Sequence, residues 1–122
     1  MTKKINVWGR EFDLTVIFDC YKGEEILSIQ EDAIKKFVAS AGELLSSSTD
    51  IEKYCIERDT DSIGDSISNI FKYVIPTSLF VKRDEKKRVV DMLCNYRFDE
   101  EHGIVMTFEN ERLVHIGTQD DL

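Results

Sequence analysis

The chain has 122 residues, a length typical of one domain, and we expect a single domain over residues 1–122. Its 24 acidic and 16 basic residues give a net charge of −8, which disfavours binding to nucleic acid or to an anionic membrane and favours a basic partner. No apolar run reaches the roughly 20 residues that cross a bilayer, and no signal peptide is evident, so we expect a cytoplasmic protein.

The N-terminal part predicts a β-hairpin. Residues 5–8 and 12–18 have strand-like composition and flank a turn expected at Gly9-Arg10. In the second strand apolar and polar residues alternate, which is typical of an antiparallel strand with one buried face and one wet face. The apolar positions are Phe12, Leu14, Val16 and Phe18.

The middle of the chain predicts helices. Ser28 followed by Glu31 is a capping-box pattern, and apolar residues recur at helical spacing over 34–45. Gly42 weakens this helix, and the serine- and threonine-rich residues 46–49 predict a break after it.

Two further apolar stripes follow this break. One lies over residues 51–55 and predicts a second helix, and another lies over residues 67–74 and predicts a third. The only proline, Pro76, is expected to close the helical region.

The C-terminal part returns to a period of two. Residues 78–82, 88–98, 104–108 and 112–117 predict a four-strand antiparallel meander with short polar turns. Strands separated along the chain from helices indicate an α+β fold. We therefore predict an antiparallel sheet, built from the N-terminal hairpin and the C-terminal meander, with two or three helices packed on one face.

Residues 99–103 (DEEHG) stand between two predicted strands and combine carboxylates, a histidine and a glycine. Gly103 can adopt positive φ, and the Asp99 side chain can accept hydrogen bonds from backbone amides that follow it. We predict that Asp99, His102 and Gly103 form a structural turn.

The same residues also allow an enzyme or metal-site interpretation. A zinc site needs about three ligands that converge, whereas neighbouring side chains in a turn diverge. The second histidine, His115, would approach His102 only through pairing of residues 104–108 with 112–116. The three cysteines are far apart with no CxxC pair, and no nucleophile or phosphate-binding motif is present. We expect no catalytic residue, metal or cofactor; a small enzyme or metal-binding module centred on His102, His115 and Asp99 is the alternative.

Acidic residues dominate the C-terminal end. From Asp99 onward there are seven acidic side chains and one basic side chain, Arg112. These carboxylates form either a generic solvated surface or a docking surface for a basic protein. The predicted partner-binding residues are Glu100, Glu101, Glu109, Glu111, Asp120 and Asp121.

The arrangement of these motifs resembles an uncharacterised family of small bacterial proteins. In that family a strand ends in Asp-x-Glu-His-Gly, and a short strand then leads to a Gly-x-Gln-Asp ending. One departure is at residues 94–97 (CNYR), where a Trp-centred strand is commoner. The matching residues are Asp99, Glu101, His102, Gly103, Gly117, Gln119 and Asp120.

Small acidic proteins like these include immunity proteins of contact-dependent growth inhibition and related toxin systems. The resemblance implies a non-enzymatic immunity protein that neutralises a cognate toxin domain, often a basic nuclease, by electrostatic docking. A regulatory adaptor that binds another protein is a further alternative. No pattern in the sequence indicates an oligomeric state.

Overall fold

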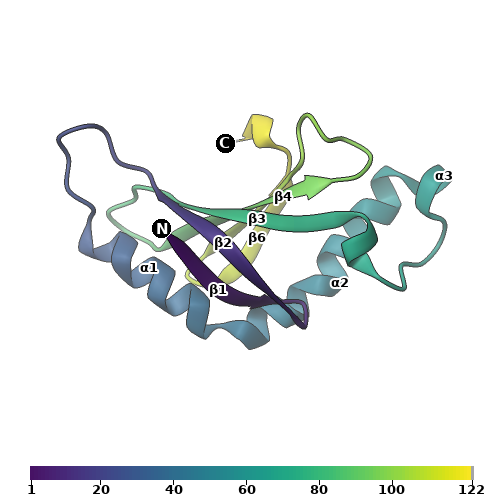
Figure 1. The fold of residues 1–122 in the computed structure, drawn as a ribbon, viewed down its shortest axis with the longest axis horizontal. Coiled ribbons are helices and arrows are strands. Elements are labelled where there is room, and N and C mark those ends of the chain that lie inside the picture. The colour runs from purple at the N-terminus through teal and green to yellow at the C-terminus, as the bar shows by residue number, and fades with distance from the viewer. Residues whose placement is uncertain (122) are drawn as a thin grey trace.

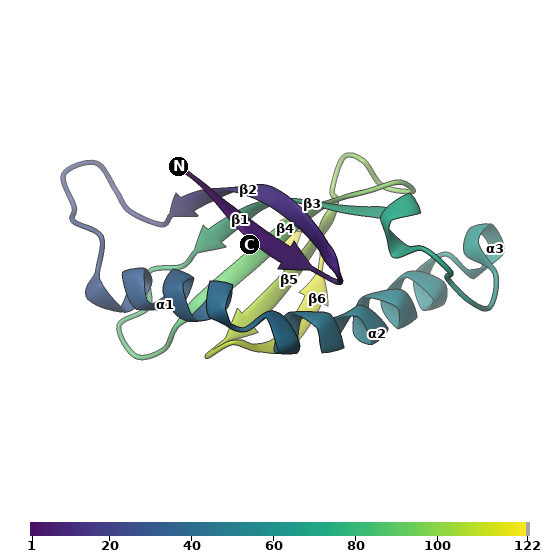
Figure 2. The same ribbon diagram turned by 60° about the horizontal axis from the view of Figure 1, so that its bottom comes forward.

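The computed structural model describes residues 1–121, apart from the side chains of Ala41, Glu43 and Asp121. These residues form a six-stranded sheet whose spatial order follows the chain, β1-β2-β3-β4-β5-β6. The two long helices lie along one face of the sheet (Figure 1, Figure 2). The predicted α+β class, with an N-terminal hairpin, C-terminal strands and helices on one face, is confirmed.

Strands β1 (Thr2–Val7) and β2 (Arg10–Phe18) form the N-terminal hairpin. The turn consists of Trp8 (φ 52°) and Gly9 (φ 89°), and positive φ at both central residues is the type I′ arrangement that suits tight hairpins. The predicted turn is therefore displaced by one residue. Trp8 accepts this unusual backbone because its buried indole Nε1 donates to Ser47 Oγ at 3.0 Å.

Helix α1 spans Ser28–Ala39, and its N-terminal cap lies one residue before the cap predicted at Ser28. The cap residue is Leu27, and its backbone N–H donates to Gln30 Oε1 at 2.9 Å. The predicted pair of Ser28 and Glu31 is therefore wrong. Gln30 takes this role because its buried amide also donates to two backbone carbonyls at the ends of β2 and β3.

Helix α2 (Ala41–Arg58) runs without interruption through residues 46–49, so the predicted break there is wrong. Ser47 is buried and its hydroxyl donates to the Leu44 carbonyl at 2.6 Å, which satisfies the hydroxyl within the helix. The two helices instead separate at Ser40. Within the described residues, no helix is both long enough and apolar enough to span a bilayer.

The predicted third helix over residues 67–74 is also wrong. The chain forms the single helical turn α3 (Thr60–Ile63) and the 3₁₀ turn η1 (Ile70–Lys72), and then enters strand β3 (Val74–Val81). Pro76 lies within β3, where the register with β4 shifts between Pro76 and Ser78. A bulge tolerates a residue that cannot donate to the ladder, so this proline does not end the helical region as predicted.

Strand β3 pairs with β2 in parallel, from Thr15↔Ser78 to Phe18↔Val81. A parallel pair needs a long crossover connection, and α1 and α2 supply it across one face of the sheet. The sheet is therefore mostly antiparallel with one parallel pair that the sequence pattern did not predict.

The C-terminal strands β4 (Val89–Tyr96), β5 (Ile104–Glu109) and β6 (Arg112–Gly117) continue from β3 as an antiparallel meander. A last 3₁₀ turn, η2, covers Gln119–Asp121. Alternate β4 side chains face the helices and are buried with the aromatic pair Phe37–Phe108. These β4 side chains are Val90, Met92, Cys94 and Tyr96.

Candidate functional site: the acidic end of the sheet

The segment between β4 and β5 is a compact turn closed by Asp99. The Gly103 amide donates to the Asp99 carbonyl at 2.9 Å, and the His102 amide donates to Asp99 Oδ1 at 3.2 Å. The imidazole Nδ1 of His102 lies 3.0 Å from the same carboxylate oxygen. The structure thus brings Asp99, His102 and Gly103 together in one hydrogen-bonded turn.

Gly103 packs directly on the backbone of the neighbouring strand. Its φ is +59°, a left-handed conformation, and a Cβ atom placed there would lie 2.6 Å from the Cys94 carbonyl oxygen. Only glycine combines this conformation with so close an approach. The turn is therefore fixed against β4 by shape as well as by hydrogen bonds.

A chain of charged contacts joins this turn to helix α2 and to the C-terminal segment. Arg58 Nη2 donates to Asp99 Oδ2 at 2.6 Å, and His102 Nε2 lies 3.6 Å from Asp120 Oδ2. The Gln119 amide donates to the His102 carbonyl at 3.0 Å. Segments from three parts of the chain are thereby held at one end of the sheet.

These contacts shift the protonation of both turn residues. The hydrogen bond from Arg58, assisted by those from His102, lowers the pKa of Asp99. The hydrogen bond to Asp99, together with the nearby charges of Asp99 and Asp120, raises the pKa of His102. Both shifts favour an ionised Asp99 beside a protonated His102, an arrangement that stabilises the turn electrostatically.

The predicted partner-binding carboxylates fall into two groups. Glu100, Glu101 and Asp120 are exposed around the 99–103 turn, and we call these three residues the acidic end. Apart from the contact of Asp120 with His102, no ion pair among the described residues involves them. The side chain of Asp121 lies outside the described residues.

Glu109 and Glu111 lie at the opposite end of β5 and already have partners. Lys87 Nζ lies 3.0 Å from Glu109 Oε1. Arg88 donates to both carboxylate oxygens of Glu111, at 2.8 and 3.1 Å. The structure therefore does not bring Glu109 and Glu111 into one patch with the acidic end, because the two turns are separated by the length of a strand.

The residues of the alternative enzyme or metal site are only partly brought together. Asp99 contacts His102, but His115 lies on β6, opposite Thr107 of β5. The backbone carbonyl of His102 instead accepts from the backbone N–H of Gln119, so His102 lies beside Gln119. Four residues of chain separate His115 from Gln119, which is on the order of 10 Å along a strand. In the part of the chain that the structure describes, no three His, Cys, Asp or Glu side chains gather as metal ligands would.

One contact of this site was not predicted from the sequence. Arg58 is 41 residues from Asp99 along the chain, and its guanidinium also lies 5.2 Å from the centre of the Tyr96 ring. Tyr96 in turn donates its hydroxyl hydrogen to Asp59 Oδ2 at 2.6 Å. The only indication of this contact in the sequence is the charged segment that begins at Arg58. The spacing of apolar residues does not predict which residue a charged side chain contacts.

A family model for a domain of unknown function, DUF6985, matches residues 1–122. No curated protein matches the chain. No solved structure matches it either. The match covers the N-terminal hairpin, the helices and the whole acidic end, and the chain therefore belongs to the DUF6985 family.

Proposed function

We propose that this protein is a non-enzymatic immunity protein that binds a cognate bacterial toxin domain and blocks it by electrostatic docking. The observation that carries the proposal is the acidic end: two exposed carboxylates on a turn that is tightly fixed, with the exposed Asp120 of η2 beside it. The proposed partner is a basic domain, such as a nuclease, and the proposed place of action is the bacterial cytoplasm.

Rigidity favours Glu100 and Glu101 as docking residues. Their turn is held by the Arg58–Asp99 ion pair and by the close approach of Gly103 to Cys94. A surface that is ordered before binding loses less conformational entropy when the partner arrives. Exposed carboxylates at its tip would also attract a basic partner over about a Debye length.

Glu109 and Glu111 fit this role less well. A basic partner would first have to displace Lys87 or Arg88 from them, and the exchange of one ion pair for another gains little. We therefore place the docking surface at the acidic end and assign Glu109 and Glu111 to the stabilisation of the adjacent turns.

The proposal that the protein is not an enzyme is supported by the contacts of Asp99 and His102, two of the residues on which the alternative enzyme site is centred. Asp99 and His102 are hydrogen-bonded to each other, and Asp99 is also bound by Arg58. A general base needs a carboxylate or imidazole available to a substrate. Here Asp99 is engaged within the turn, and His102 Nε2, the atom that such a pair would offer to a substrate, lies 3.6 Å from Asp120 Oδ2.

The proposal predicts that charge reversal at the acidic end slows capture of the toxin. The partner for this test is the toxin domain that the proposal expects to be encoded beside the gene for this chain, and stopped-flow mixing measures the association rate. We expect the double variant Glu100→Lys/Glu101→Lys to associate about tenfold more slowly at low salt, since steering contributes tenfold or more to such rates.

The matched control is Asp13→Lys/Glu25→Lys, which makes the same change in net charge at exposed positions on β2 and in the loop before α1. It should change the rate by less than about threefold, because its charges lie outside the proposed docking surface. Equal slowing by both variants, or no binding of the neighbouring toxin by the native chain, would contradict the proposal.

A further inference from the structure

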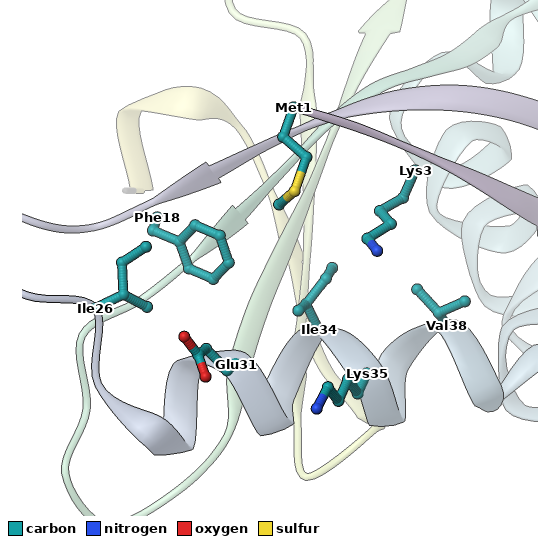
Figure 3. A pocket seen from close by; sticks show the side chains of 8 residues that line it. All are labelled: Met1, Lys3, Phe18, Ile26, Glu31, Ile34, Lys35 and Val38. Atoms are coloured by element: carbon teal, nitrogen blue, oxygen red, sulfur yellow. The ribbon is translucent and has the colours of Figure 1, made fainter.

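A pocket opens between the N-terminal hairpin and helix α1, on the face of the sheet that carries the helices (Figure 3). Its volume is about 440 Å³, within the range of pockets that hold small molecules. Its wall is mainly apolar and is formed by Met1, Phe18, Ile26, Ile34 and Val38. None of the residues that line it belongs to the acidic end.

The pocket exists because α1 packs on the middle of the sheet rather than on its edge. Within the sheet, α1 contacts mainly β3 and β4, so the open end of the β1–β2 hairpin, away from its turn, is left uncovered. Lys3 lies there, on the same face of β1 as the buried residues Ile5 and Val7. A lysine thus occupies the last position of a row that otherwise packs into the core.

The two lysines at the pocket, Lys3 and Lys35, make no ion pair with any of the residues that the structure describes. By contrast, Lys4, on the opposite face of β1, lies 3.8 Å from Glu11. Figure 3 shows Lys3 reaching from β1 toward α1, above the apolar side chains of that helix. An unpaired ammonium group over an apolar wall is complementary to a ligand with an anionic head and an apolar body.

Glu31 restricts the ligand further. Its side chain lies near Ile26 in the pocket, away from Lys3 (Figure 3). A second anionic group at that end would be repelled, so a ligand with a single negative charge fits best.

We propose that this pocket binds a small amphipathic anion with one carboxylate-like head, which pairs with Lys3. The apolar body lies along α1, against Ile34, Phe18 and Ile26. This site is independent of the proposed toxin-binding surface.

The test uses the full chain and decanoate as the probe, with binding measured by isothermal titration calorimetry and by NMR shifts of the α1 amides. We expect saturable binding at one site. Lys3→Met keeps the apolar stem of the side chain but removes its charge, and it should weaken binding about tenfold. Lys4→Met is the matched control, on the same strand but the opposite face, and should change binding by less than about twofold.

Two further arms separate the contributions of the body and the head. Ile26→Asp places a charge in the apolar wall at a partly exposed loop position, so the fold should persist while decanoate binding is lost. Decyltrimethylammonium has an apolar chain of similar length with a cationic head and should not bind. Absence of saturable decanoate binding, equal effects of Lys3→Met and Lys4→Met, or equal affinity for the cationic probe would each overturn the proposal.

Discussion

At the residue scale, one turn concentrates the structural constraints of the molecule. Asp99 accepts hydrogen bonds from the His102 amide and from Arg58, and Gly103 lies against the Cys94 carbonyl oxygen. Gly103 in particular has a conformation and a close approach that a residue with a Cβ atom would not tolerate. We therefore expect substitutions in this turn to lower the free energy of unfolding.

Replacement of Gly103 by alanine should destabilise the fold by about 2–3 kcal/mol, because a left-handed conformation and a backbone clash are imposed together. Gly42→Ala is the control: Gly42 lies in α2 with open space around the added carbon, so alanine should stabilise by up to about 1 kcal/mol. Urea unfolding followed by Trp8 fluorescence measures both. Equal effects of the two substitutions would contradict the account of the turn.

The His102–Asp99 pair should make stability depend on pH. The pKa of His102 is raised in the folded state, so its contribution is fully present below the unfolded pKa of about 6.5 and is lost as pH rises through the folded value. The lowered pKa of Asp99 keeps the carboxylate ionised through this range. His102→Gln should therefore cost more stability at pH 5.5 than at pH 9, as measured by urea unfolding; a loss that is independent of pH would argue against the pair.

At the element scale, the alternation of apolar residues was sufficient to predict the hairpin and the C-terminal meander. In a strand with one solvent-exposed face, every second residue is apolar, so the pattern shows which side faces the core. The same pattern does not indicate the parallel pairing of β2 and β3, since that pairing depends on how the helices cross the sheet. The same limit explains the helix break predicted at residues 46–49, where burial of Ser47 beneath Trp8 outweighs local preference.

The candidate site divides in the same way. Turn chemistry was sufficient to predict that the Asp99 carboxylate accepts from a backbone amide of the turn, which lies three residues on, at His102. The contact of the His102 imidazole with that carboxylate was not predicted. The contact with Arg58 spans 41 residues and requires the folded chain. The separation of Glu109 and Glu111 from the acidic end follows from the strand between the two turns, but their ion pairs with Lys87 and Arg88 do not follow from the pattern.

The start of α1 provides a direct comparison of the predicted cap with the observed one. Gln30→Leu removes hydrogen bonds to the Leu27 amide and to the carbonyls of Asp19 and Val81, and should cost about 2–4 kcal/mol because these groups lose their partners. Glu31→Gln should change stability by less than about 0.5 kcal/mol. Thermal unfolding by circular dichroism distinguishes them, and the reverse order of effects would restore the capping pattern predicted from the sequence.

At the scale of the whole molecule, the carboxylates at the two ends of β5 differ in whether they form ion pairs. Ion pairs neutralise the carboxylates beside β6, whereas Glu100 and Glu101 stay exposed at the other end of β5. In the proposed role, the net charge of −8 would attract a basic partner, and the acidic end would give that attraction a direction. Charge of this kind acts mainly on the rate of association.

The most direct measurement of the central claim is how the association rate of the native chain with the proposed partner, a toxin domain encoded beside its gene, depends on salt. Stopped-flow mixing at ionic strengths from about 10 mM to about 1 M takes the Debye length from about 30 Å to about 3 Å. Electrostatic docking predicts that the rate falls at least about tenfold across this range while dissociation changes much less. A rate that stays constant from low to high salt would contradict docking through the acidic end.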